Sequence, residues 1–323
     1  MKTKISPEVF EGVWSATPTP FNSALSVDEH SVVRMVDHHV SLGVKGLFLA
    51  GTCGEGPWMR DSEKRRLVQA AVAAARGRLR VAVQVTDNSA PRILDNIACA
   101  REDGADFAII APPYFLVNVT PKNLQRLYLE SIRESPLPIA FYDRGRHSSI
   151  LIPHEILESI YSEPNVIAVK DSSSDPKRRE VALAARRRRP QLRLLTGDEF
   201  RCVEYLRAGY DGLLLGGAIF HGKLAVQIGR AVANGDLSLA EELERHMIRL
   251  MYAVYGGKRI FCWLSGVKYL LVKMRIFRTA NSHLNYPLTS GCRHAIDRVL
   301  AQERSVLFPE NRPREAQAGK HTR

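Results

Sequence analysis

The sequence has few cysteines and no long apolar run, and both absences exclude whole classes of protein. Five cysteines occur in 323 residues and none forms a CxxC pair, so neither a disulfide framework nor a cysteine-rich zinc motif is predicted. The N-terminus lacks the apolar segment of a secretion signal, and no apolar stretch reaches the ~18 residues of a membrane span. We therefore expect a soluble cytoplasmic protein with no membrane partner.

Nucleotide- and nucleic-acid-binding signals are also missing. No predicted strand-to-helix turn carries GxGxxG, and no glycine-rich turn ends in GK[ST]. The chain is basic, with 46 Lys and Arg against 34 Asp and Glu and a net charge of +12. The excess gathers at 177–179, 186–189 and the C-terminal tail, without interleaved aromatic residues or a recognition motif. We interpret these runs as solvated helix faces and expect no nucleic-acid partner.

The sequence does contain a regular alternation of short β-rich runs and longer helical patterns. Such alternation predicts βαβ units around a parallel sheet, and eight pairs favour a closed α/β barrel over an open doubly wound sheet. The expected strands are 12–16, 46–50, 80–85, 107–111, 138–142, 166–170, 192–195 and 212–215. The expected helices are 27–42, 61–75, 90–102, 121–134, 153–162, 176–188, 200–208 and 222–233.

Beyond the eighth pair only helical patterns remain, at 237–255, 259–275 and 292–303. Helices alone cannot extend a parallel sheet. We therefore predict a (β/α)8 TIM barrel over 1–234 that holds the active site, a C-terminal helical region over 235–308, and a disordered tail over 309–323.

Two side chains at predicted strand ends could carry chemistry, because the active site of such a barrel lies at the carboxyl ends of its strands. Lys170 ends the apolar run 166–169. Desolvation in a barrel mouth disfavours the ammonium form and leaves an amine that can attack a carbonyl, although a lysine simply leaving the sheet for solvent fits its position equally well. Tyr142 closes the preceding strand, where a phenol could move protons for Lys170, but a strand-end tyrosine more often serves packing.

A glycine-flanked turn, Gly51-Thr52-Cys53-Gly54-Glu55-Gly56, follows the second predicted strand. Backbone N–H groups and a hydroxyl in such a turn can bind a carboxylate. Glycine-rich turns also commonly serve chain geometry alone, so this segment is a weak signal by itself.

Together these segments, in this order, resemble the family of dihydrodipicolinate synthase and N-acetylneuraminate lyase from residue 12 to about 300. Gly51-Thr52-Cys53-Gly54-Glu55 is similar to the family's G-[ST]-x-G-E loop, and Val169-Lys170-Asp171-Ser172 to its K-[DE]-[ST] Schiff-base strand. Further matching segments are 12–21 for the opening strand and turn, Ala111-Pro112-Pro113-Tyr114 for P-P-Y, Phe141-Tyr142 for the tyrosine strand, and Thr196-Gly197-Asp198-Glu199 for the glycine-acid turn.

The resemblance implies a class I aldolase or carbon–carbon lyase with Lys170 as the Schiff-base lysine, Tyr142 as the acid/base and Thr52 as the hydroxyl that joins Tyr142 in a proton relay. It implies that the N–H groups of Thr52 and Cys53 bind the carboxylate of pyruvate or another 2-oxo acid. The imine nitrogen then acts as the electron sink for carbon–carbon bond chemistry with an aldehyde, so no cofactor and no metal are expected. Gly51, Gly197 and Leu214 complete the expected substrate-binding residues.

The sequence departs from the family's pattern at positions that affect which aldehyde the protein can bind. Lysine-pathway synthases usually have a second hydroxyl residue at the place of Cys53 and a cross-dimer tyrosine at the place of Phe115. Their catalytic tyrosine is followed by N-x-P and then by an arginine for the aldehyde's carboxylate. Here the segment reads Tyr142-Asp143-Arg144-Gly145-Arg146-His147, with His147 at the arginine's position. The candidates to bind substrate in this segment are therefore Arg146, His147 and Arg144.

Three functions therefore remain open. We favour a Schiff-base lyase or aldolase with an unknown aldehyde, ahead of dihydrodipicolinate synthase (4-hydroxy-tetrahydrodipicolinate synthase) itself and of a non-catalytic barrel that binds a 2-oxo acid. The family resemblance and the apolar loop Pro113-Tyr114-Phe115-Leu116 predict a homodimer or homotetramer.

Overall fold

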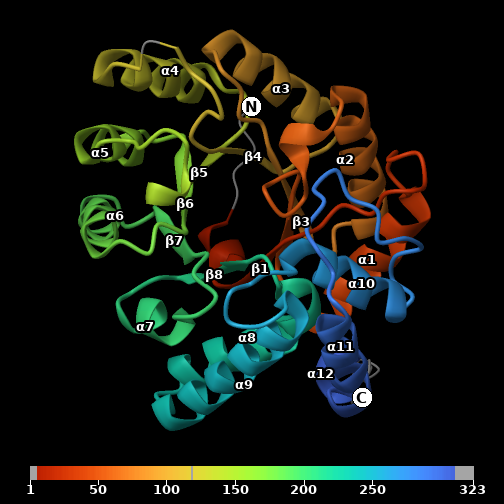
Figure 1. The fold of residues 1–323 in the computed structure, drawn as a ribbon. Coiled ribbons are helices and arrows are strands. Elements are labelled where there is room, and N and C mark those ends of the chain that lie inside the picture. Colours follow the sequence, from red (N-terminus) through yellow and green to blue (C-terminus); the bar gives the residue numbers. More distant parts are fainter. Residues whose placement is uncertain (1–5, 118, 310–323) are drawn as a thin grey trace, which may run out of the picture.

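The computed structural model describes residues 6–117 and 119–309. Its eight parallel strands close into a barrel in sequence order, with β8 paired to β1, and Figure 1 shows the helices ringed around them. This confirms the predicted TIM barrel. The strands are β1 (Gly12–Ala16), β2 (Gly46–Leu49), β3 (Arg80–Gln84), β4 (Phe107–Ile110), β5 (Ile139–Asp143), β6 (Val166–Asp171), β7 (Arg193–Thr196) and β8 (Gly212–Leu215).

The side chains of each strand alternate between two apolar cores, as a period of two requires. One core fills the barrel lumen and the other lies between the strands and the helices. At the amino end of the barrel, the rings of Phe10, Trp14 and Phe107 pack with centroids 5.3–5.7 Å apart. This aromatic cluster, to which the short helix η1 (Pro7–Phe10) contributes Phe10, closes one end of the lumen.

The outer helices begin where local capping signals occur. Asp28 caps α1 by accepting from the Ser31 N–H, Thr120 caps α4, and Asp175 caps α6. These side chains satisfy N–H groups that have no partner inside the helix. The helices that follow the strands are α1 (Glu29–Leu42), α2 (Asp61–Ala75), α3 (Ala90–Glu102), α4 (Pro121–Glu134), α5 (His154–Ser162), α6 (Pro176–Arg188), α7 (Cys202–Arg207) and α8 (Ala218–Ala233).

The C-terminal helices gather beside α8 (Figure 1). They are α9 (Leu237–Tyr255), α10 (Trp263–Lys273), α11 (Ser290–Gln302) and α12 (Arg304–Leu307). The predicted division after residue 234 falls in the turn between α8 and α9 and stays a prediction. The predicted tail lies outside the described residues, apart from Pro309.

Most predicted boundaries differ from the structure by no more than two residues, and the larger differences have local causes. The helix expected from residue 259 begins at Trp263, because Ile260 adopts a left-handed φ of 54° and the Cys262 N–H turns back to the Tyr255 carbonyl. Helix α8 was expected to start at Gly222, but it starts four residues earlier and includes the turn 218–221. The short helix α12 was not predicted from the sequence.

Candidate functional site at the carboxyl ends of the strands

Lys170 and Tyr142 face each other at the open end of the barrel. They are register partners on the neighbouring strands β6 and β5, and both are buried. The Lys170 Nζ lies 4.3 Å from the centroid of the Tyr142 ring and 5.0 Å from that of Phe48. The amine therefore points into the lumen and not into bulk solvent, which removes the alternative that Lys170 merely leaves the sheet.

The phenol of Tyr142 has surroundings suited to proton transfer. Burial opposes its ionisation, but the charges of Lys170 and Arg144 and hydrogen bonds with Ser172 and Thr52 outweigh burial and lower its pKa. A lowered pKa brings the phenol nearer the pH at which an acid/base group works well. The contact with Thr52 joins the second-strand loop to the tyrosine, while Ser172 is a partner that the sequence did not single out.

The loop that follows β2 offers two backbone donors. The turn is closed by hydrogen bonds from the Glu55 N–H to the Thr52 carbonyl and from the Gly56 N–H to the Gly51 carbonyl, each 3.2 Å. Within the described residues, the N–H groups of Thr52 and Cys53 have no hydrogen-bond partner. Adjacent N–H groups without a partner are chemically suited to bind a carboxylate.

A buried ion pair holds this loop to the C-terminal helices. The Lys268 ammonium on α10 contacts the Glu55 carboxylate, and both side chains are fully buried. The other oxygen of Glu55 accepts from the Ser282 hydroxyl at 2.8 Å and from the His283 N–H at 2.6 Å. Sequence reasoning missed Lys268, because nothing local marks a lysine more than two hundred residues away as the partner of Glu55.

The remaining predicted residues of the lumen lie near Lys170. A Cβ on Gly197 would lie 2.0 Å from the Ser172 hydroxyl and 2.9 Å from the Lys170 Cε, so only glycine fits beside the lysine stem. Leu214 packs in the same apolar cluster as Tyr142, and Gly51 adjoins the ring of Phe48. Burial raises the pKa of Cys53 to about 12, so this side chain is a neutral thiol at ordinary pH.

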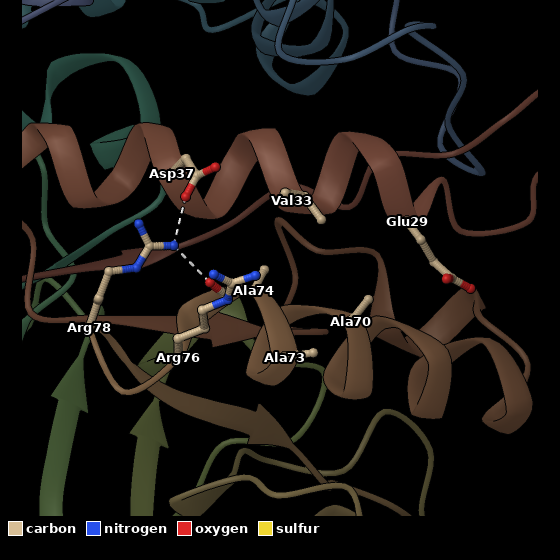
Figure 2. Close-up of a pocket in the computed structure, with 8 residues that line it drawn as sticks. All are labelled: Glu29, Val33, Asp37, Ala70, Ala73, Ala74, Arg76 and Arg78. Carbon is tan, nitrogen blue, oxygen red and sulfur yellow. Dashed lines mark hydrogen bonds and ion pairs between the residues drawn. The ribbon is translucent and has the colours of Figure 1, made fainter.

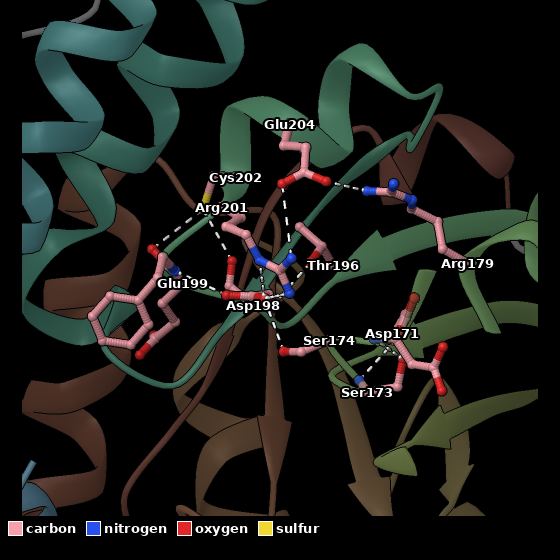
Figure 3. A network of polar contacts seen from close by, with 12 residues as sticks. Asp171, Ser173, Ser174, Arg179, Thr196, Asp198, Glu199, Arg201, Cys202 and Glu204 are labelled. Atoms are coloured by element: carbon pink, nitrogen blue, oxygen red, sulfur yellow. Dashed lines mark hydrogen bonds and ion pairs between the residues drawn. The ribbon is translucent and has the colours of Figure 1, made fainter. Parts of the chain in front are cut away.

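Polar contacts brace the loops after β6 and β7 (Figure 3). Asp171 accepts from the Ser173 N–H and hydroxyl at 2.9 and 2.7 Å. Asp198 accepts from the Ser174 hydroxyl and from Arg201, each at 2.9 Å. These bonds join the two loops just beyond Lys170 and Gly197, and so fix the backbone from which both residues project.

A second polar group, which is largely but not fully buried, lies beside the site. Glu199 accepts from the Gly217 N–H at 2.5 Å and from the Tyr255 hydroxyl at 2.9 Å, and lies 3.4 Å from the buried ring of His221. Burial alone would raise the Glu199 pKa, but His221 and the two donors lower it. Glu199 belongs to the glycine-acid turn found in the sequence, whereas Tyr255 and His221 were not predicted.

Comparisons with known proteins agree with this geometry. A family model described as the Dihydrodipicolinate synthetase family matches residues 9–292. The chain belongs to the dihydrodipicolinate synthetase family. Its membership confirms the predicted family, and with it the class of carbon–carbon lyases of the class I aldolase type.

Individual relatives of this family member are distant in sequence. The chain is 28% identical over 249 residues to the 4-hydroxy-tetrahydrodipicolinate synthase of Phenylobacterium zucineum, covering 77% of this chain and 83% of the relative. The dihydrodipicolinate synthase structure from Bacteroides thetaiotaomicron superposes with a TM-score of 0.82 at 24% identity, over 90% and 98% of the two chains. A prophage protein of the family from E. coli K12, solved with pyruvate, superposes with a TM-score of 0.80 at 20% identity, over 91% and 98%.

The segment after Tyr142 is where this family member departs most from the expected pattern. Arg146 and His147 lie in the short helix η3 (Gly145–His147), and both are exposed. Arg144 is half-buried, and its guanidinium carbon lies 6.0 Å from the Tyr142 ring centroid. Of the three candidates left open by the sequence, Arg144 is the one whose contact with the site is seen.

The loop after β4 of this family member presents apolar side chains to solvent. Phe115 is 67% exposed and Val117 is 72% exposed. The neighbouring Tyr114 has a hydroxyl, which accepts a hydrogen bond from the Gln84 amide. Phe115 itself has no hydroxyl and cannot extend a proton relay.

The basic residues at 177–179 and 186–189 are only partly solvated. Arg178 binds both oxygens of Asp143, Arg179 and Arg186 pair with Glu204 and Asp211, and Arg189, just after α6, donates to main-chain carbonyls. Lys177, Arg187 and Arg188 are exposed, so the predicted solvated face holds for these three and is wrong for the residues that make contacts within the barrel.

One surface hollow lies away from the barrel mouth and lacks its chemistry. It has a volume of about 560 Å³ and is lined by alanines, Val33 and charged residues of α1, α2 and the turn after α2 (Figure 2). It lies in the outer helical layer, and Arg78 there is already bonded to Asp37 at 2.6 Å. Across residues 6–117 and 119–309, no three His, Cys, Asp or Glu side chains are arranged to hold a metal, and no helix is long and apolar enough to cross a membrane.

Proposed function

We propose that this protein makes or cleaves a carbon–carbon bond between pyruvate, or a similar 2-oxo acid, and an aldehyde, through an imine on Lys170. The observation that carries the proposal is the placement of the Lys170 amine 4.3 Å from the ring of Tyr142, whose phenol is hydrogen-bonded to Thr52. The free N–H groups of Thr52 and Cys53 are suited to the 2-oxo acid's carboxylate. One small substrate could contact all three groups.

Each chemical step can be assigned to a group at this site. The Lys170 amine adds to the keto carbon, and water leaves once Tyr142 has supplied a proton to the carbinolamine oxygen. Loss of a proton from the adjacent carbon gives the enamine, whose electron pair forms a bond to the aldehyde carbon. Hydrolysis of the new imine releases the product and the free lysine, and the cleavage direction runs the same steps backwards.

Borohydride trapping tests the imine. Wild-type protein incubated with pyruvate and then reduced should carry a stable adduct on Lys170, located by peptide mass spectrometry. Lys170→Ala should carry none, while Lys177→Ala, which removes an exposed lysine at the start of α6, should be labelled like the wild type. An undiminished adduct in Lys170→Ala would refute the proposal.

The main alternative within the family is 4-hydroxy-tetrahydrodipicolinate synthase, the name carried by the curated relative. That reaction needs aspartate semialdehyde, which carries both a carboxylate and an ammonium group. Here His147 stands where an arginine is expected and is exposed, and Phe115 lacks a hydroxyl. We expect aspartate semialdehyde to be a poor acceptor, and a wide margin in its kcat/KM over other aldehydes would favour the alternative.

A non-catalytic barrel that binds a 2-oxo acid is the second alternative. It would turn over no member of a panel of aldehydes and 2-oxo-3-deoxy acids, whether or not borohydride traps pyruvate on it. The hydrogen bonds of Tyr142 with Thr52 and Ser172 favour the enzyme, because they hold a group able to move protons beside the Lys170 amine.

We further propose that the chain works in the cytoplasm as a homodimer or homotetramer. The exposed side chains of Phe115 and Val117 support a contact between copies, since a contiguous apolar loop is better buried than solvated. Phe115 and Val117 follow Tyr114 in the loop after β4, near the mouth of the barrel, so a contact between copies at this loop would help to enclose the site.

A further inference from the structure

Arg144 places a positive charge beside Tyr142. It follows Tyr142 by two positions and lies just beyond the end of β5, where the backbone leaves the strand with a φ of −105° and a ψ of −4°. The Arg144 guanidinium carbon lies 6.0 Å from the centroid of the Tyr142 ring, and the Lys170 amine lies 4.3 Å from the same centroid. An imine on Lys170 and the guanidinium are therefore close enough for one small substrate to span them.

The backbone on both sides of Arg144 is fixed. Asp143 receives two hydrogen bonds of 2.8 Å from the buried Arg178 guanidinium, one to each carboxylate oxygen. The Gly145 N–H donates to the same carboxylate at 2.9 Å. Gly145 has a φ of 49°, and a Cβ there would lie 2.7 Å from that of Ser173, so the chain packs against the loop after β6. Arg144 thus projects from an anchored segment, which limits the entropy lost on binding a ligand.

Among the described residues, the Arg144 guanidinium contacts the Tyr142 ring but no carboxylate. Within the described residues it makes no ion pair and no hydrogen bond, although it is half-buried. The neighbouring Arg178 shows the contrast, because its guanidinium is satisfied by Asp143 and the Ile152 carbonyl. A partly desolvated guanidinium without a carboxylate has unused donors in a geometry that matches a carboxylate.

We propose that Arg144 is the specificity-determining residue for the acceptor, and that it selects an aldehyde bearing a carboxylate. The proposal rests on the proposed imine chemistry at Lys170. The guanidinium binds the acceptor's carboxylate while the aldehyde carbon meets the enamine.

Two aldehydes that differ by one group test this selection. Succinic semialdehyde carries the carboxylate, and butanal has a methyl group in its place. With pyruvate as donor, we expect the wild type to prefer succinic semialdehyde over butanal by about 10- to 150-fold in kcat/KM, the usual contribution of a charge-assisted hydrogen bond.

Four variants assign the preference to one residue. Arg144→Gln should reduce the preference for succinic semialdehyde over butanal to near unity. Arg144→Lys should retain part of it, because lysine keeps the positive charge but cannot bind a carboxylate through two parallel hydrogen bonds. Arg187→Gln removes an exposed charge on α6 and serves as the control for net charge; its preference should be unchanged. Arg146→Gln tests the rival arginine of η3.

Two results would overturn the proposal while leaving the function intact. One is equal use of succinic semialdehyde and butanal by the wild type; the other is loss of preference in Arg146→Gln but not in Arg144→Gln. Borohydride trapping of pyruvate, measured on the same preparations, separates these cases from failure of the proposed function. If no wild-type adduct forms, the imine chemistry itself is refuted.

Discussion

The ion pair between Glu55 and Lys268 should be the costliest polar contact to break near this site. Both side chains are fully buried, so replacing Lys268 by methionine leaves a carboxylate in an apolar environment with only the Ser282 hydroxyl and the His283 N–H as partners. Removing one member of a buried pair typically costs about 3–5 kcal/mol. For a chain of this size, that corresponds to a fall in Tm of roughly 4–7 °C.

The double variant Glu55→Gln with Lys268→Met should recover much of this loss. The amide can still accept the two hydrogen bonds, and no buried charge remains unpaired. Because Glu55 ends the loop that carries Thr52 and Cys53, both changes should also raise the KM for pyruvate more than they lower kcat.

Differential scanning calorimetry of the two single variants and the double variant measures the coupling. Lys273→Met is a matched control, since it makes the same substitution on the same helix at an exposed pair with Asp297, and it should shift Tm far less. The reasoning is refuted if Lys268→Met unfolds at the wild-type temperature, or if the double variant is no more stable than Lys268→Met.

Four further outcomes are expected. Tyr142→Phe should slow turnover by about 100- to 10000-fold, as loss of a placed acid/base does, and an unchanged kcat in steady-state assays would show that another group moves the proton. Burial disfavours the Tyr142 phenolate but the charges of Lys170 and Arg144 lower its pKa, so Arg144→Gln should raise that pKa and move the phenol-dependent limb of the pH–rate profile to higher pH. Gly197→Ala should retain the fold by circular dichroism yet slow the rate of borohydride-trapped adduct formation, because the new methyl group collides with the Ser172 hydroxyl and the Lys170 stem. Light scattering should give a dimer or tetramer, and a monomer at micromolar concentration would contradict the proposed contact through Phe115.

The sequence by itself determined the succession of strands and helices and the strand ends that carry Lys170 and Tyr142. Both follow from local physics: apolar runs of strand length, helical periodicity, and caps such as Asp175 before Pro176 act over a few residues. Once parallel strands close into a barrel, residues at their carboxyl ends must meet at one mouth. That rule placed Thr52, Tyr142 and Lys170 together without any knowledge of their distances.

Only the tertiary structure decided which side chains surround that mouth. Lys268 reaches Glu55, and Tyr255 reaches Glu199, from helices beyond the barrel. The sequence offered three neighbouring cations after Tyr142, but the Asp143–Arg178 pair turns the chain so that Arg144 lies by the ring while Arg146 and His147 are exposed. Contacts between segments far apart in the chain depend on how the whole barrel packs, and no local pattern records them.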